Sequence, residues 1–417
     1  MIWVLLGIAM GYGRSLVYFI ELARHGARSP SNNMEWDENR WPDGLSILSP
    51  EGMRQHFLIG KYLKTRYSKN TPLIPSEYNV TSLTLIANEV ERTQRSLISQ
   101  MLGFYPQKPW HRKLSKNPSV PLTLKNTTFV GTDFHIPAFY MQIAAGNTML
   151  RAKDGCPQYK SFVKSRKKSS GADKIFSKYK DLLQKVQNKY NCSYKEAKDL
   201  ILDIISSIRS NRFAGNSWDP YFDQEFCEKG QELYMEIKHY SSFSPDYIAR
   251  FTASDFLRGI HGILNKVRTG QVQDKGTIFL AHDTTIFSVI SGLGTWMSEQ
   301  PPFATVLLFE VYSNGDSLEI EMIYNMKSLR VPGFGKFVVG LDEFLEYLMR
   351  RSFEDFDESC RGIEKIPIED EEVEELEVSG GSHILLNTCF ALSQYFIVFT
   401  LVYMFLKSKR KDRNESS

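Results

Sequence analysis

The chain has 417 residues and a formal net charge of +3, with 51 basic side chains against 48 acidic ones. Because the charge is nearly balanced, the chain is unlike the strongly basic proteins that bind nucleic acid through their overall charge. It also gives no reason to expect an anionic membrane surface as a partner. Charge gathers in two stretches, a basic one at 164–180 and an acidic one at 369–377.

The first strand that we expect leads directly into a cluster of basic residues. Residues 1–13 are largely apolar and end in small residues, which is typical of a secretory signal peptide. Residues 16–22 are rich in β-branched and aromatic side chains and predict a buried strand. Arg24, His25 and Arg28 follow it at once. Guanidinium groups present paired donors that match phosphate or carboxylate oxygens, so we interpret this stretch as an anion site.

A second strand with a basic end follows the first predicted helix. A Ser-Pro pair at 49–50 is typical of a helix start and predicts a helix that continues to Arg66. Residues 83–87 predict another buried strand, which leads to Arg92. We expect the helix after Arg92 to end at Gly103. The arrangement of strand, basic residue and helix therefore occurs twice.

The middle of the chain predicts helices. Ser193 and Glu196 form a capping box, and apolar residues between 200 and 208 recur at helical spacing on one face. A further helix is expected over 222–240. We interpret the basic stretch at 164–180 as a solvated loop and helix face. This region is therefore predicted to be an all-helical insertion between two parts of an α/β domain.

The third strand with a charged end lies in the last third of the chain. Residues 276–281 predict a buried strand that ends at His282 and Asp283, before another helix. An Asn-Gly pair between two apolar runs also predicts a β-hairpin. We expect a long helix at 244–268. The two strands of the hairpin are expected at 306–312 and 318–324, and a last amphipathic helix at 341–353.

The C-terminal end predicts a membrane anchor. Residues 384–406 contain no charged side chain and are long enough to cross a bilayer core of roughly 30 Å. Basic residues follow, which place the tail in the cytoplasm by the positive-inside rule. We expect a single-pass type I membrane protein of the lysosome, another endomembrane or the plasma membrane, with most of the chain lumenal or extracellular.

The predicted organisation joins these parts. Before the membrane helix, the acidic stretch is interpreted as a hydrated stalk. In chain order we expect a signal peptide at 1–13, an α/β domain in two parts at 14–145 and 244–365 around a helical insertion at 146–243, the stalk at 366–383, the transmembrane helix at 384–406 and the basic tail at 407–417.

Sequons and cysteines agree with a lumenal or extracellular position. Sequons for N-glycosylation begin at Asn79, Asn126 and Asn191. Cys389 lies in the predicted membrane helix, which leaves an even set of cysteines in an oxidising compartment. This set allows several pairings, and the spacing does not choose among them. A bond between neighbouring helices through Cys192 and Cys227 is one hypothesis; the other members are Cys156 and Cys360.

The three charged strand ends predict one shared site. In an open α/β sheet such ends meet at a single crevice, which would bring together Arg24, His25, Arg28, Arg92, His282 and Asp283. The chain has no HExxH, paired CxxC or aspartate cluster that would predict a metal site. Hydrolysis of a phosphate ester without a metal requires a protein nucleophile, which we assign to His25. Asp283 is the acid that would protonate the leaving alcohol.

These motifs resemble those of the histidine acid phosphatase family, a branch of the histidine phosphatase superfamily, and most of all its lysosomal and prostatic types. Residues 24–30 match the RHGxRxP motif, Arg92 with Thr93 matches the second arginine motif, and His282 with Asp283 matches the HD motif. The resemblance covers roughly residues 16–360. It implies an α/β fold with a phosphoglycerate-mutase-like mixed central sheet and flanking helices, and no cofactor.

The resemblance also implies a role for each site residue. His25 would be phosphorylated and Asp283 would donate the proton, while the phosphate oxygens would be bound by Arg24, Arg28, Arg92 and His282. It implies disulfides between Cys156 and Cys360 and, for the pair that is left, between Cys192 and Cys227. It suggests a homodimer, for which the sequence itself shows no pattern.

The sequence therefore favours a membrane-anchored acid phosphatase that hydrolyses phosphate monoesters through a phosphohistidine. A phytase or a lipid phosphatase would share the same core, and a substrate panel would separate them. A non-catalytic membrane receptor that retains the fold is the alternative from a different class. The complete set of site residues argues against this receptor.

Overall fold

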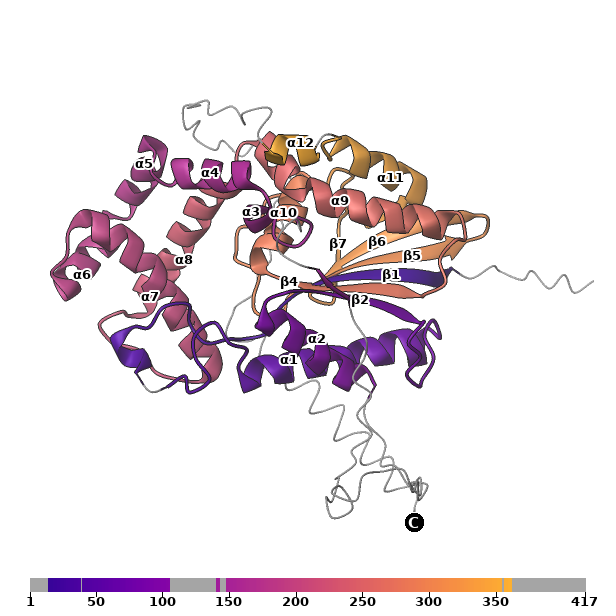
Figure 1. Cartoon of the computed structure of the whole chain (residues 1–417), viewed down its shortest axis with the longest axis horizontal. Helices are drawn as coiled ribbons and strands as arrows, with labels where there is room; N and C mark the ends of the chain where they lie inside the picture. Colours follow the sequence, from indigo (N-terminus) through magenta and orange to yellow (C-terminus); the bar gives the residue numbers. More distant parts are fainter. Residues whose placement is uncertain (1–13, 39, 106–139, 143–147, 355, 362–417) are drawn as a thin grey trace, which may run out of the picture. The chain divides into compact units, whose positions relative to one another are not determined.

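The computed structural model describes residues 14–38, 40–105, 140–142, 148–354 and 356–361 (Figure 1). All of them belong to the first of two compact units, which spans 1–381. Among the described residues, no helix is both long and apolar enough to cross a membrane. The predicted signal peptide, stalk, membrane helix and basic tail, and the sequon at Asn126, lie outside the described residues.

A mixed eight-stranded sheet forms the centre of the described chain (Figure 1). Its strand order is β3-β2-β4-β1-β5-β6-β7, and β8 pairs with β6. β1 lies between β4, which is parallel to it, and β5, which is antiparallel. The strands are β1 (Ser15–Arg24), β2 (Leu83–Asn88), β3 (Tyr140–Gln142), β4 (Gly276–Ala281), β5 (Val306–Asn314), β6 (Ser317–Tyr324), β7 (Lys327–Leu329) and β8 (Val338–Gly340).

The topology brings several strand ends to one edge of the sheet. β1, β2 and β4 run parallel, so their carboxyl ends lie at the same edge. β5 runs the opposite way, so its amino end lies at that edge too. The predicted strands and the hairpin of β5 and β6 are confirmed. β1 is buried on both faces, as expected for the parallel centre of a sheet, where strands read as continuous apolar runs.

Helices cover both faces of the sheet (Figure 1). α1 (Pro50–Lys64) and α2 (Glu91–Phe104) pack together on one face. The other face carries α9 (Asp246–Arg268), α10 (Asp283–Gly292) and α11 (Leu341–Arg350). The Ser49 hydroxyl accepts from the backbone N–H of Gly52, which confirms the predicted start of α1.

α2 ends at Phe104, one residue beyond the expected end, but Gly103 does not stop the helix as predicted. Gly103 lies inside α2 rather than after it. A Cβ added there would lie 1.9 Å from the carbonyl oxygen of Phe57 in α1. This glycine therefore permits close contact between two helices, a role that its position in the sequence does not distinguish from that of a helix stop.

The described residues between β3 and α9 form helices and the turns that join them. We call residues 152–243 the helical lobe. Its apolar core includes Phe176, Leu183, Ile201, Ile204 and Phe222, all buried, and the Ser193–Glu196 capping box is present. The lobe contains α3 (Ala152–Gly155), α4 (Pro157–Arg166), α5 (Ser170–Lys178), α6 (Lys180–Tyr190), α7 (Tyr194–Ala214), α8 (Gln224–Lys238) and the short η4 (His239–Phe243).

One implied disulfide is present and the other is not. Cys156 is bonded to Cys360, with their Cα atoms 4.9 Å apart. Cys192 and Cys227 are free thiols, so the predicted bond between them is wrong. Cys227 is buried in the apolar core of the lobe, where its sulfur lies 4.0 Å from the carbonyl oxygen of Phe222. It packs there as a small apolar side chain, and burial raises the pKa of its thiol.

Candidate active site

The turn after β1 is fixed on both sides by backbone hydrogen bonds. The N–H of His25 donates to the carbonyl of Ala281 at the end of β4, at 3.0 Å. The N–H of Ala304 donates to the carbonyl of His25, also at 3.0 Å, and the N–H of Arg24 donates to Thr305 at 2.8 Å. Arg24 and His25 are each only 2% exposed. Both side chains are therefore held at the sheet edge where the other predicted site residues arrive.

A glycine allows this turn to rest on the start of α1. A Cβ added to Gly26 would lie 2.3 Å from the carbonyl oxygen of Gly52, so the two backbones touch. The N–H of Gly26 donates to the hydroxyl of Ser96 in α2 at 3.0 Å. The turn between His25 and Arg28 is thus braced by both helices, which explains why a glycine follows the histidine.

The hydrogen bond of the His25 ring identifies its free nitrogen. Nδ1 lies 2.8 Å from the carbonyl oxygen of Gly26. A carbonyl can only accept, so Nδ1 carries the proton and the lone pair is on Nε2. Burial and the charges of Arg92 and Arg24 hold the pKa of His25 well below its ordinary 6.5. His25 is therefore neutral down to acidic pH, with an available lone pair.

The three predicted arginines lie around His25, and their positive charges repel one another. Burial lowers the pKa of Arg28 to about 10, with Arg24 adding to the effect. Burial also lowers the pKa of Arg92 to about 9, with Arg28 and Arg151 adding to it. The Nε atoms of Arg24, Arg28 and Arg92 are buried, and none has a hydrogen-bond partner among the described residues. Such donors fit an anion that would bond them and offset their repulsion.

His282 lies opposite His25 at the start of α10. The two rings are 5.5 Å apart and edge to face. Nε2 of His282 lies 3.2 Å from the amide oxygen of Asn88 and so donates to it, while Nδ1 lies 3.5 Å from Nη2 of Arg92. Burial and the nearby Arg92 hold the pKa of His282 well below its usual value. Asn88 and Arg92, from the second strand-to-helix unit, thereby orient a ring from the third.

Asp283 is the first residue of α10, where the helix dipole favours negative charge. Its Oδ1 accepts from the N–H of Thr284 at 2.9 Å. Its Oδ2 accepts from Nε2 of Gln300 at 2.5 Å and lies 3.5 Å from Nη2 of Arg24. Burial raises the pKa of this carboxyl, but Arg24, Lys238 and Arg209 together lower it by more, so the pKa is well below its usual value. The carboxyl is ionised when no anion is bound nearby.

Several side chains at the site are absent from the sequence-based prediction. Arg209 of α7 and Arg24 both donate to the carbonyl of Pro301, at 2.9 and 2.5 Å. The guanidinium carbons of Arg24 and Arg209 lie 4.3 and 4.9 Å from the centroid of the Phe303 ring. Gln300 is also bonded to the hydroxyl of Tyr234 in α8, at 3.2 Å. The helical lobe therefore contributes to the surroundings of Asp283 through α7 and α8.

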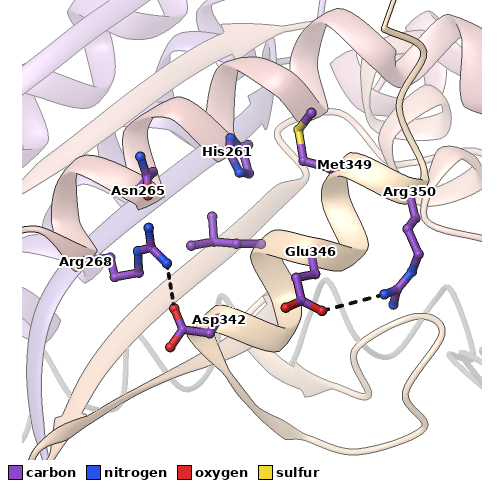
Figure 2. A pocket seen from close by; sticks show the side chains of 8 residues that line it. His261, Asn265, Arg268, Asp342, Glu346, Met349 and Arg350 are labelled. Atoms are coloured by element: carbon purple, nitrogen blue, oxygen red, sulfur yellow. Dashed lines mark hydrogen bonds and ion pairs between the residues drawn. The ribbon is translucent and has the colours of Figure 1, made fainter.

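A separate cavity of about 700 Å³ lies between α9 and α11 (Figure 2). Ion pairs at 3.1 Å between Arg268 and Asp342, and at 3.8 Å between Arg350 and Glu346, neutralise much of its lining. None of the predicted site residues contributes to its lining. This cavity therefore has no part in the chemistry at the sheet edge.

Sequence comparison identifies the family. The profile of the histidine phosphatase superfamily, branch 2, matches residues 15–325, which is most of the chain. The chain belongs to this superfamily. The matched range contains every predicted residue of the site, so the predicted family, and with it an enzyme, is confirmed.

Curated relatives and solved structures agree with membership of the histidine phosphatase superfamily. Human lysosomal acid phosphatase is 23% identical over 342 residues, which cover 76% of this chain and 73% of that protein. Human prostatic acid phosphatase is 22% identical over 344 residues, which cover 76% and 80%. A Hafnia alvei phytase in complex with myo-inositol hexakis sulphate is similar in structure, with a TM-score of 0.61 at 15% identity over 85% of this chain and 100% of that one. This similarity concerns the fold.

Proposed function

We propose that this protein is an acid phosphatase that hydrolyses phosphate monoesters through a covalent phosphohistidine on His25. The observation that carries the proposal is the free Nε2 of a neutral, buried His25 among arginines whose buried Nε atoms lack partners. In this site Arg24, Arg28 and Arg92 bind the phosphate oxygens and stabilise the charge of the transferring phosphoryl group. His282 adds a donor when the negative charge of the bound phosphate raises its pKa and Nδ1 takes up a proton.

The reaction consists of two displacements at phosphorus. In the first, Nε2 of His25 attacks phosphorus, the bond from phosphorus to the ester oxygen breaks, and Asp283 gives its proton to the leaving alkoxide. In the second, Asp283 takes a proton from water as the water oxygen attacks phosphorus. The phosphorus–nitrogen bond then breaks, which restores neutral His25. Phosphate leaves as the monoanion with the proton that Asp283 took from water, so Asp283 is again ionised, as in the free enzyme.

Trapping of the intermediate tests this proposal. The enzyme is mixed with a radiolabelled phosphate ester, quenched rapidly and digested under alkaline conditions. We expect acid-labile, alkali-stable label on the peptide that contains His25, because a phosphorus–nitrogen bond is stable to base and not to acid. Turnover without label on His25 would contradict a phosphohistidine, and label on a different residue would move the nucleophile there.

The acid optimum should depend on an ionisation of the substrate. Asp283 is ionised in the free enzyme, so its proton must arrive with the ester, as the monoanion. The second pKa of a phosphate monoester is about 6, so kcat/KM should fall as pH rises above it. On the acid side activity should persist below pH 6.5, because the pKa of His25 is lowered from that value and the ring stays neutral.

Profiles of kcat/KM against pH for two esters with different second pKa values check this expectation. The pH at which kcat/KM falls on the alkaline side should change with the second pKa of the ester. The pH at which it falls on the acid side should be the same for both esters. An alkaline limb at the same pH for both esters would contradict delivery of the proton by the substrate.

The topology that the sequence predicts is part of the same proposal. A signal peptide at 1–13 and a membrane helix at 384–406 would make a type I protein with a lumenal or extracellular catalytic part. The disulfide between Cys156 and Cys360 supports an oxidising compartment. Asn79 and Asn191 are exposed and so accessible to glycosylation. Attachment to a membrane, the choice of compartment and a homodimer stay predictions.

A further inference from the structure

Three buried polar side chains lie in a row behind the turn that contains His25. Glu21 belongs to β1, His56 to α1 and Gln100 to α2, and each of them is 0% exposed. Nε2 of Gln100 lies 2.9 and 2.7 Å from the two carboxyl oxygens of Glu21. Oε1 of Gln100 lies 2.9 Å from Nδ1 of His56. We call these three side chains the polar row.

The polar row ends at the peptide group between Arg24 and His25. Nε2 of His56 lies 3.0 Å from the carbonyl oxygen of Arg24. The N–H of the same peptide group belongs to His25 and donates to the carbonyl of Ala281, also at 3.0 Å. The side chain of His25 is attached directly after this peptide group. Its position therefore depends on the hydrogen bond from His56 as well as on the sheet.

The hydrogen bonds of the polar row require one titratable proton. Nε2 of His56 donates, because the carbonyl of Arg24 can only accept. Without a further proton, Nδ1 of His56 and the carboxylate of Glu21 are both acceptors, and the NH2 group of Gln100 faces only one of them. The row is therefore complete only when either Glu21 or His56 is protonated.

Burial places this proton on Glu21. Burial raises the pKa of the Glu21 carboxyl to about 8, and the hydrogen bond from Gln100 lowers it by less. Burial likewise lowers the pKa of His56 to about 4. In the neutral row Glu21 donates to the amide oxygen of Gln100, and the amide nitrogen donates to Nδ1 of His56. This arrangement exchanges the oxygen and nitrogen of the Gln100 amide, which have nearly the same shape.

A second buried carboxyl shows what Glu21 lacks. Glu310 of β5 pairs with Phe19, two residues before Glu21, so both carboxyls lie on the same face of the sheet. Arg66 of η2 (Thr65–Asn70) binds Glu310 through two contacts of 2.6 Å, and the hydroxyl of Tyr67, which faces both carboxyls, donates to Glu310 at 2.8 Å. Among the described residues, no cation lies at ion-pair distance from Glu21. Glu21 is therefore suited to remain protonated.

We propose that His56 is a positioning residue for the proposed nucleophile, and that the proton of Glu21, acting through Gln100, keeps His56 in place. His56 holds the peptide group before His25, so that Nε2 of His25 stays in line for attack on phosphorus. This inference rests on the proposed function, because it takes His25 as the nucleophile.

Two amide substitutions of His56 test the positioning role in the full-length protein. Glutamine is one carbon longer than asparagine, so its NH2 reaches about as far as Nε2 of histidine, whereas that of asparagine reaches only about as far as Nδ1. His56→Gln can still donate to Arg24, and kcat for 4-nitrophenyl phosphate should stay within about threefold. His56→Asn leaves a buried carbonyl without its donor, and kcat should fall roughly tenfold to hundredfold.

Binding of inorganic phosphate separates positioning from a general defect. Its dissociation constant, measured by equilibrium binding, should be nearly the same in both variants, because Arg28 and Arg92 are unchanged. The matched control is His261→Asn, the same substitution at the cavity between α9 and α11, which should leave kcat unchanged.

The outcomes separate this inference from the proposed function. Equal kcat values for His56→Gln and His56→Asn, whether high or low, would overturn the positioning role. A loss of phosphate binding as large as the loss of kcat in His56→Asn would also overturn it. Absence of turnover of any phosphate ester by the unmodified protein would instead contradict the proposed function.

Glu21→Gln tests the proton of the polar row, and it does so even where His56→Asn does not fold. The new amide donates to Gln100 without a titratable proton, so kcat should be retained. The Glu21 contribution to stability falls as pH rises from 4.5 to about 8, because the unfolded state releases the proton that the folded state keeps. The melting temperature of the variant should therefore rise relative to that of the unmodified protein over this range. A constant difference, or a large loss of kcat, would overturn the role of the Glu21 proton.

Discussion

Replacing His25 with alanine should lower kcat for 4-nitrophenyl phosphate by about ten-thousandfold or more, because the variant has no nitrogen that can form the covalent intermediate. Arginines that remain can still hold the ester, so binding of phosphate should persist. The measurements are steady-state hydrolysis and the dissociation constant of inorganic phosphate, which is obtained by equilibrium binding.

His261→Ala is the matched control for this variant. His261 lies on α9 at the separate cavity between α9 and α11 (Figure 2), whose lining includes none of the predicted site residues, so its loss should leave kcat unchanged. Thermal unfolding of both variants establishes that they are folded. If a folded His25→Ala protein retained most of its activity, the nucleophile would have to be another residue.

Replacing Asp283 with asparagine should slow alkyl esters far more than aryl esters. A poor leaving group needs a proton as its bond to phosphorus breaks, and general acid catalysis contributes about a hundredfold to ten-thousandfold. A nitrophenolate leaves without that help, so its first step should change little. Asparagine keeps the size of the side chain and can still contact Gln300, so the neighbouring structure should be preserved.

The leaving-group dependence of kcat/KM measures this effect. A series of esters with alcohols of increasing pKa should give a steeper dependence for the variant than for the unmodified protein. Asp316→Asn, on the exposed turn of the β5–β6 hairpin, provides a carboxylate loss that should leave the slope as it was. An equal loss of kcat/KM for all esters would show that Asp283 is not the general acid and that it acts in binding instead.

The site residues that sequence analysis found all follow a parallel strand. Arg24 is the last residue of β1, while Arg92 and His282 come after β2 and β4, and the rule that such ends meet at one edge was sufficient to group them. The same rule did not identify Gln300 and Phe303, because these residues precede a strand instead of following one. β5 is antiparallel to β1, so the segment before it reaches the same edge, and neither its direction nor its neighbour can be read from local sequence.

Residues from the helical lobe were missed for a different reason. The apolar spacing of α7 correctly predicted its buried face, but Arg209 lies beside that face and looks like an ordinary flanking charge. Tyr234 and Lys238 of α8 are likewise typical of an amphipathic helix. Only the packing of the lobe against the segment that contains Gln300 and Pro301 gives them a place near Asp283. Tertiary contacts of this kind leave no periodic signal in a single sequence.

The central position of β1 also constrains when the enzyme can become active during synthesis. The ribosome makes His25 near the start of the chain, but both strands that flank β1 come from residues 276–281 and 306–313. Contacts between residues so distant in sequence form slowly, because a long loop must close first. The nascent protein therefore carries His25, the proposed nucleophile, without its neighbouring strands until most of the chain has emerged, and we expect activity only when β4 and β5 have paired with β1.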